Sequence, residues 1–322
     1  MSIVKSHMSN VSFVFFGTPD LSVEILDHLK RAGFIPSLVV TNPDRPQGRN
    51  LLVTPPPTKL WAIANDIPFL QPENLSDPVL LRQLSTSKFQ LFVVVAYGKI
   101  IPKAILELPE KGTLNIHYSL LPKYRGASPI ETAILADDQN TGVTIMLMDE
   151  KMDHGPIVAQ RALQITNHKS QIPDKTQTTN PSIQTPKQLE WPMKASELRK
   201  ICNLLGAELL TETIPLWVEG KIKPSEQDHG KATYAPKIEK ENGLIDLAGD
   251  PYKNFLKFQA YENWPGVYFL AGKDGKKNRI IVKTARFEDG KFIITRVIPE
   301  GKKEISYNEF LRGSGTREKS NA

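Results

Sequence analysis

Three polar residues, an asparagine, a histidine and an aspartate, stand where two apolar stretches of the chain end. Asn115 and His117 lie in segment 112–129 (GTLNIHYSLLPKYRGASP), and Asp153 follows the apolar run 142–149 (GVTIMLMD). Side chains two residues apart lie on one face of a strand, so Asn115 and His117 are predicted side by side. Because the carboxyl ends of strands in an open α/β sheet form the ligand crevice, we expect Asp153 to join them in one site.

An amide, an imidazole and a carboxylate suit attack on a carbonyl by an external nucleophile. N–H groups of Asn115 and His117 would donate to the oxygen that becomes negative, and losing one such donor costs on the order of 10²–10³ in rate. Asp153 would orient His117 and relay a proton from an attacking amine. The alternative without chemistry is that Asn115 caps a turn and His117 is a hydrogen-bonded interior histidine.

Two other chemistries use the same residues. Ser119 with His117 and Asp153 would form a hydrolytic triad, but the chain has no G-x-S-x-G elbow around this serine. His117, Asp153 and His154 would bind a metal, but the six histidines form no H-E-x-x-H motif and there is no cysteine pair. We therefore expect no metal.

The elements that would position these residues alternate between strands and helices. Apolar runs predict strands over 11–16, 36–41 and 91–96, and helices over 21–31, 58–64 and 78–84, with a Pro- and Gly-rich loop over 42–57. Such alternation is typical of a Rossmann-like, doubly wound and mostly parallel sheet in an α/β protein. A dinucleotide ligand is not expected, because Gly17 stands alone where G-x-G-x-x-G is needed.

Beyond this sheet the composition changes twice. Residues 165–194 are rich in Thr, Gln, Pro and Asn, which predicts a flexible linker or insertion. Ser196 is then the expected N-cap of a connecting helix over 195–219, and its predicted buried stripe is Leu198, Ile201, Leu204, Leu205 and Leu209. After residue 220 short strands over 267–270, 279–284 and 291–297 predict a small barrel or sandwich. The domains are thus expected at 11–194 and 220–314.

Composition and charge narrow the class further. The 322 residues are 40% hydrophobic, the apolar runs are too short for a membrane span, and the single Cys202 fits a reducing cytoplasm. Residues 1–220 hold 21 Lys or Arg and 21 Asp or Glu, whereas residues 221–322 hold 20 and 14, so the last third carries the whole net charge of +6. A basic C-terminal domain favours a polyanionic partner such as nucleic acid, although a solvated basic surface is an equal alternative.

The two chemistry-bearing segments together resemble the 10-formyltetrahydrofolate-dependent formyltransferase superfamily. The resemblance rests on NIHYSLLPKYRGASPI (115–130) with GVTIMLMDEKMDHG (142–155). Within the superfamily, further segments are similar to the branch whose acceptor is initiator methionyl-tRNA. These segments are FFGTPD (15–20), TNPDRPQGR (41–49), VVAYGKIIP (94–102), ATYAPKIEKENGLID (232–246) and NWPGVYF (263–269).

The resemblance implies transfer of a formyl group from 10-formyltetrahydrofolate to the α-amine of methionyl initiator tRNA. It implies catalytic roles for Asn115, His117 and Asp153, and an OB-like C-terminal domain that helps hold tRNA. It also implies folate contacts from a four-residue loop and tRNA contacts from two arginines. The loop is Ser119, Leu120, Leu121 and Pro122, and the arginines are Arg45 and Arg49. We expect a cytoplasmic monomer without a membrane partner.

One departure and three alternatives accompany this resemblance. The family's loop after PDRPxGR usually carries lysines, where this chain has NLLV (50–53). The alternatives are a formyltransferase acting on a sugar-nucleotide amine, a 10-formyltetrahydrofolate hydrolase, and a non-enzymatic RNA-binding protein. The last would retain the basic third and lose the three polar residues, which are present here.

Overall fold

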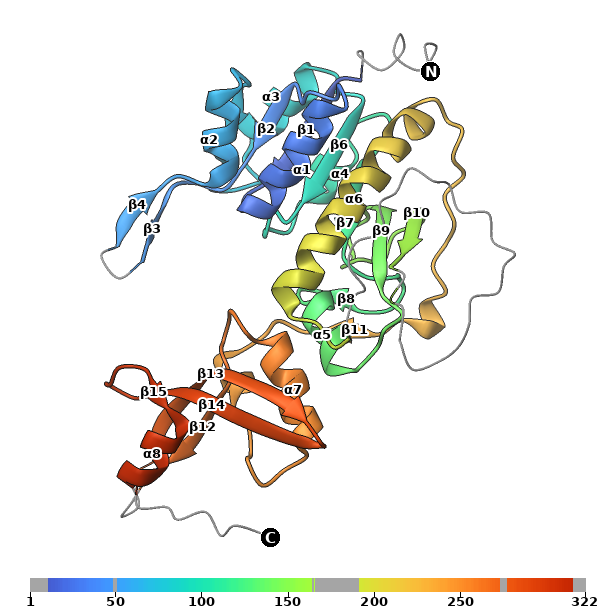
Figure 1. Ribbon diagram of the computed structural model, residues 1–322. Coiled ribbons are helices and arrows are strands. Elements are labelled where there is room, and N and C mark those ends of the chain that lie inside the picture. The colour runs from blue at the N-terminus through green and yellow to red at the C-terminus, as the bar shows by residue number, and fades with distance from the viewer. Residues whose placement is uncertain (1–10, 49–50, 164, 166–190, 273–276, 315–322) are drawn as a thin grey trace. The chain divides into compact units, whose positions relative to one another are not determined.

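The computed structural model describes residues 11–48, 51–163, 165, 191–272 and 277–314 (Figure 1). Contacts within the chain divide it into two compact units. The first unit comprises residues 1–126, 141–163 and 200–234, and the second comprises residues 127–140, 164–199 and 235–322. Most of the predicted insertion, residues 166–190, lies outside the described residues.

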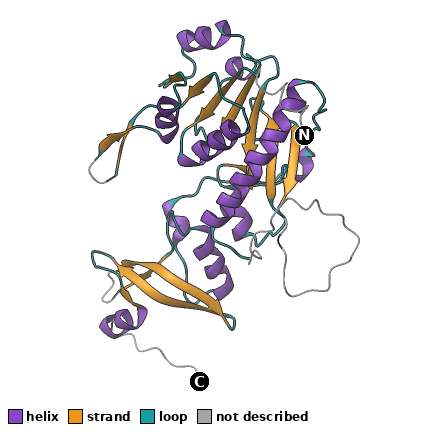
Figure 2. Ribbon diagram, turned by 45° about the horizontal axis from the view of Figure 1, so that its top comes forward, coloured by secondary structure: helices purple, strands orange, loops and turns teal. Residues whose placement is uncertain are grey.

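A seven-stranded sheet forms the centre of the first unit, in the order β10-β9-β7-β6-β1-β2-β5. Strands are orange and helices purple in Figure 2. Its strands are β1 (Phe13–Gly17), β2 (Leu38–Val40), β5 (Phe69–Leu70), β6 (Leu91–Val95), β7 (Thr113–His117), β9 (Gly142–Leu147) and β10 (Ile157–Ala162). The five strands from β7 to β5 are parallel, and β9 pairs antiparallel with both β7 and β10. The predicted α/β architecture around a mostly parallel sheet is therefore confirmed.

Helices cover both faces of this sheet, which explains why β1 and β6 are apolar along their whole length. The helices are α1 (Asp20–Arg31), α2 (Pro57–Ala64), α3 (Pro78–Thr86), α4 (Lys103–Leu106) and α6 (Ala195–Val218), of which residues 200–218 belong to this unit. On one face Val94 of β6 packs in a core with residues of α3 and α4. Asn115 pairs with Val94 in register and so faces the same side.

Helix α6 packs on the opposite face through a close approach. A side chain at Gly206 would come within 2.9 Å of Ile116 on β7 and 3.4 Å of Val143 on β9. Ile116 therefore faces α6, and its neighbours Asn115 and His117 face away from that helix. The predicted alternation along β7 is confirmed by this packing.

The predicted details of α6 were wrong in two respects. Ser196 is not the N-cap, because the helix already begins at Ala195 and the Ser196 N–H donates to Glu262 Oε1 at 2.9 Å. Leu204 is 56% exposed, whereas Cys202 is fully buried. The buried stripe runs through Leu198, Cys202 and Gly206 because the helix uses its small residue to approach the sheet. By length and composition alone α6 could cross a membrane, since an 18-residue window has a mean hydropathy of 1.2 and 44% of it is buried, but a core helix of a soluble protein passes the same test.

The stretch predicted as a loop over 42–57 contains a short antiparallel hairpin. It consists of β3 (Arg45–Gln47) and β4 (Leu52–Thr54). Leu51, Leu52 and Val53 are 71%, 68% and 67% exposed. No apolar/polar alternation marks these strands in the sequence, which is why the hairpin was missed.

The second unit contains a four-stranded antiparallel sheet, in the order β12-β13-β14-β15. Its strands are β12 (Tyr268–Ala271), β13 (Asn278–Glu288), β14 (Lys291–Pro299) and β15 (Ile305–Ser306), and its helices are α5 (Pro129–Leu135), α7 (Pro251–Ala260) and α8 (Tyr307–Ser314). Asp289 and Gly290 both adopt positive φ at the β13–β14 turn, as a two-residue hairpin requires. The three predicted strands are present, and β13 is longer than predicted. The remaining short elements are β8 (Arg125–Gly126), η3 (His229–Lys231), β11 (Tyr234–Ala235) and η4 (Lys240–Gly243).

Replacing Tyr97 with phenylalanine is expected to stabilise the protein by about 1 kcal/mol. The Tyr97 hydroxyl is buried without a hydrogen-bond partner among the described residues, and such a group costs roughly 1–3 kcal/mol. Its ring packs edge-on against Phe16, a contact that phenylalanine retains. Urea unfolding would measure the gain, and a loss of stability would contradict this account.

The stability gained by Tyr97→Phe is expected to increase in alkaline solution. Burial raises the pKa of Tyr97 from about 10 to about 12. The unfolded chain therefore ionises before the folded protein, and the wild type loses stability as the pH rises from 10 towards 12. The phenylalanine variant does not undergo this loss.

Candidate functional site

The end of β7 positions an amide and an imidazole in different surroundings. His117 is 5% exposed, and its Nε2 lies 2.9 Å from the Tyr124 carbonyl oxygen. A carbonyl only accepts, so Nε2 carries the proton and Nδ1 of the neutral ring is left with a lone pair. Asn115 is half-buried, and its side-chain amide has no hydrogen-bond partner within the described residues. The amide is therefore open to a bound molecule.

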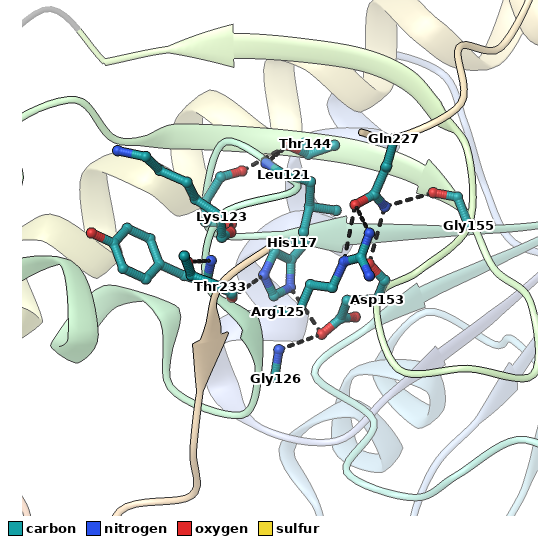
Figure 3. A network of polar contacts seen from close by, with 12 residues as sticks. His117, Leu121, Lys123, Arg125, Gly126, Thr144, Asp153, Gly155, Gln227 and Thr233 are labelled. Carbon is teal, nitrogen blue, oxygen red and sulfur yellow. Dashed lines mark hydrogen bonds and ion pairs between the residues drawn. The ribbon is translucent and has the colours of Figure 1, made fainter. Parts of the chain in front are cut away.

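Asp153 lies against the other side of the His117 ring. Its Oδ2 is 3.6 Å from His117 Nδ1, and the same oxygen accepts the Gly126 N–H at 2.7 Å (Figure 3). The Asp153 side chain is 17% exposed. The structure brings these two residues together, as predicted, with the carboxylate facing His117 Nδ1.

The route by which Asp153 arrives differs from the predicted one. Strand β9 is antiparallel to β7, so its carboxyl end lies beside Leu114 near the start of β7 and not beside His117. Asp153 instead reaches His117 from the loop 148–156, in which it adopts a left-handed backbone conformation with φ of 47°. Short polar residues are those that tolerate this conformation best apart from glycine.

The loop 148–156 is held in place by the segment 225–234, which follows α6. Gln227 Nε2 donates to the carbonyl oxygens of Asp153 at 3.0 Å and Gly155 at 2.7 Å. Ser225 and Ile157 exchange two backbone hydrogen bonds at 2.8 Å each. Gln227 is 4% exposed, so the hydrogen bonds of its side chain are largely shielded from water. The position of Asp153 therefore depends on a residue 74 positions further along the chain.

Arg125, which follows the loop 119–122, bonds to the segment 225–234. Its guanidinium is 3% exposed and donates to Gln227 Oε1 at 3.1 and 2.7 Å, and its Nη2 lies 2.9 Å from His229 Nδ1. The Arg125 backbone N–H donates to the Thr233 carbonyl at 2.8 Å. Sequence reasoning missed both Arg125 and Gln227, since the only signal was their polarity.

The loop 119–122 is fastened to strands β9 and β10. The Thr144 hydroxyl donates to the Ser119 carbonyl at 2.7 Å and accepts the Leu121 N–H at 3.2 Å. Gln160 Nε2 donates to the Leu121 carbonyl at 3.0 Å. Leu121 is buried, whereas Leu120 and Pro122 are half-buried. The loop thus presents a fixed backbone and two partly accessible apolar side chains.

The contacts among the described residues do not assemble either of the two rival sites. The Ser119 hydroxyl donates to the Lys123 carbonyl at 2.6 Å, and the His117 ring nitrogens face Tyr124 and Asp153. In the described structure, Ser119 and His117 therefore do not form a nucleophile–base pair. His154 bonds Asp149 Oδ2 at 2.7 Å and stacks on His229 with 4.0 Å between ring centres, so it does not join His117 and Asp153 as a ligand set.

Of the two arginines predicted to contact tRNA, the structure describes Arg45. Arg45 begins β3, its side chain is 59% exposed, and it pairs with the carboxylate of Glu73. Exposed pairs of this kind contribute little to stability, so the guanidinium remains available to another anion. Arg49 lies outside the described residues.

Replacing Gln227 with leucine is expected to destabilise the protein by about 2–4 kcal/mol. The buried Gly155 carbonyl and the part-buried Asp153 carbonyl would lose their donor, and the Arg125 guanidinium would keep only its contact with His229. Each buried unsatisfied group costs roughly 1–3 kcal/mol. Gln71→Leu is the matched control, because Gln71 also donates two hydrogen bonds but is only half-buried. Equal losses in chemical denaturation would refute a special role for Gln227.

This arrangement can bind a polarised oxygen and move a proton. The Asn115 amide offers an N–H group to an oxygen, and His117 Nδ1 is a proton acceptor next to a carboxylate. A proton taken up by Nδ1 would lie between the ring and Asp153, where the opposite charge stabilises it. Such a site suits attack by an amine on a carbonyl carbon.

Comparisons with known proteins point to one family. A family model described as "Formyl transferase" matches residues 9–184. The methionyl-tRNA formyltransferase of Chloroflexus aurantiacus is 40% identical over 279 residues, which cover 86% of this chain and 81% of the relative. The methionyl-tRNA formyltransferase of Halalkalibacterium halodurans is 35% identical over 330 residues, covering 95% and 96%.

Solved structures show the same fold. The N-formyltransferase of Helicobacter canadensis, solved with folinic acid and dTDP-3-aminofucose, has a TM-score of 0.57 at 16% sequence identity. The match covers 92% of this chain and 98% of that one. At this identity the likeness concerns the fold alone.

Proposed function

The chain is an enzyme of the formyl transferase family, and on this basis we propose that it transfers the formyl group of 10-formyltetrahydrofolate to the α-amine of methionyl initiator tRNA. The observation that carries the proposal is the pairing of His117 Nδ1 with Asp153 Oδ2 beside the open amide of Asn115. The two relatives described above carry the name of this activity and match most of the chain.

Each of the three residues takes one step of the transfer. As the amine nitrogen attacks the formyl carbon, the carbonyl electron pair moves to oxygen, and the Asn115 N–H donates to this oxyanion. His117 Nδ1 accepts the proton that the attacking nitrogen loses, and the Asp153 carboxylate stabilises the resulting imidazolium. His117 then returns the proton to the leaving nitrogen as its bond to the formyl carbon breaks.

The hydrogen bond between His117 and the Tyr124 carbonyl changes the role that we assign to His117. Because Nε2 already donates to Tyr124, this N–H is not free to serve the oxyanion in the present geometry. We therefore assign oxyanion stabilisation first to Asn115 and proton transfer to His117 with Asp153.

The residues of loop 119–122 fit the proposed folate donor. Leu120 and Pro122 expose apolar surface, which suits the faces of a pterin or aminobenzoyl ring. The Ser119 hydroxyl donates to the Lys123 carbonyl, so Ser119 stabilises the shape of the loop. Leu121 is buried and anchors the loop in the protein. We propose no metal in this reaction.

For the tRNA, we propose that residues 220–314 are an OB-like domain that follows the catalytic domain 11–194 and the connecting helix 195–219. The excess of positive charge after residue 220 supports binding along a phosphate backbone, which weakens as salt rises. Arg45 and Arg49 are proposed contacts to the acceptor stem. A cytoplasmic monomer without a membrane partner remains our expectation.

A sugar-nucleotide amine is the second candidate acceptor, because the solved structure described above was determined with one. The two acceptors are distinguished by incubating the enzyme and 10-formyltetrahydrofolate with methionyl initiator tRNA or with a dTDP-amino sugar. Mass detection of formyl-methionine on the tRNA supports the proposal. Formylation of the sugar alone, or release of formate without an acceptor product, would overturn it.

A further inference from the structure

A cavity of about 320 Å³ lies within the second unit, apart from the residues of the candidate site. Four of its lining residues carry the argument: Arg199, Lys237, Asn263 and Trp264. Lys237 belongs to the segment ATYAPK and Trp264 to NWPG, so two segments noted in the sequence line one cavity. Its volume is at the lower end for small-ligand sites and suits a single nucleotide.

Trp264 differs from the other tryptophans of the chain. The indole N–H groups of Trp61, Trp191 and Trp217 each donate to an oxygen at 2.7–2.8 Å. Trp264 is 55% exposed, and its indole has no hydrogen-bond partner among the described residues. An exposed aromatic face at the rim of a cavity is the surface on which an unpaired base stacks.

The polar side chains that line the cavity beside Trp264 could bind the polar parts of a nucleotide. Lys237 and Asn263 are exposed, and neither side chain has an ion-pair or hydrogen-bond partner in the described parts of the chain. Deeper in the cavity, Glu131 is neutralised by its ion pair with Arg199. The unpaired ammonium of Lys237 therefore dominates the charge at the rim, and an anion is the expected partner.

We propose that this cavity binds one unpaired nucleotide of the tRNA, with its base stacked on Trp264 and a phosphate on Lys237. The proposal rests on the proposed function and identifies the part of the tRNA-binding surface that recognises an unpaired nucleotide. A duplex would not fit, because its bases are stacked on each other and do not expose their faces.

The test compares the wild type with four variants: Trp264→Ala, Trp264→Phe, Lys237→Ala and the control Lys253→Ala. For each protein, the Kd of tRNA is measured over a salt series, and KM and kcat are measured for methionyl-tRNA. We expect Trp264→Ala to raise Kd about tenfold without changing its salt dependence, and Trp264→Phe to stay within about threefold of the wild type. Lys237→Ala should raise Kd and reduce the slope of log K against log salt by about 0.7–1. The kcat at saturating tRNA should stay within about twofold.

Lys253 provides the matched control because it is an exposed lysine of the same unit outside the cavity. Unchanged Kd in Trp264→Ala, equal losses in both Trp264 variants, or equal effects of the two lysine changes would overturn the nucleotide site. The Kd values do not depend on catalysis. If the wild type bound tRNA through Trp264 but made no formyl-methionine, the proposed function would fail and the site would stand.

Discussion

Replacing His117 with alanine is expected to lower the rate of formyl transfer by about 10³-fold while the protein still folds. The variant loses the group that takes the proton from the attacking amine, and general acid–base groups contribute about 10²–10⁴ in rate. It also leaves the Tyr124 carbonyl without its donor, which a water molecule can replace in the space of the ring. Single-turnover formylation with saturating substrates measures the effect on the chemical step.

His28→Ala is the control for this change. His28 is a half-buried histidine of α1 and belongs to the same unit. Its variant should keep the rate within about twofold. A near-normal rate for the His117 variant, or comparable losses in both, would remove His117 from the reaction.

Replacing Asp153 with asparagine is expected to lower the rate by about 10²–10³-fold with little change in tRNA affinity. The amide oxygen of asparagine can still accept the Gly126 N–H, so the loop 148–156 keeps its position. What is lost is the negative charge opposite His117 Nδ1, which stabilises the imidazolium. A 10³-fold loss corresponds to about 4 kcal/mol of transition-state stabilisation.

Asp149→Asn separates this specific role from the net charge of the loop. Asp149 lies in the same loop, but its carboxylate bonds His154 at 2.7 Å and not His117. The Asp149 variant should retain the rate within about threefold. If both asparagine variants were equally slow, the loop's overall charge and not the His117–Asp153 pair would explain the loss.

The local parts of this site could be predicted from the sequence. The five apolar residues of β6 and the alternation along β7 reflect short-range rules, so the strands and the common face of Asn115 and His117 were correctly expected. The helices α1, α2 and α3 were also correctly located, with ends shifted by one or two residues.

The long-range parts could not be predicted in this way. The antiparallel direction of β9 depends on its pairing with β7, which no short-range pattern encodes. Gln227 and Arg125 are 102 residues apart and carry no periodic signal, so their bond became visible only in the folded chain. The exposed Leu204 shows the same limit, because the face that α6 buries is decided by the close approach of Gly206.

The most direct test of the central claim is a double-mutant cycle between His117 and Asp153 in single-turnover formylation of methionyl-tRNA. If the two residues act as one proton-transferring pair, the double variant His117→Ala with Asp153→Asn should be no slower than the slower single variant, because each change already removes the shared function. Rate losses that multiply in the double variant would show that the residues act independently, and this result would contradict the account.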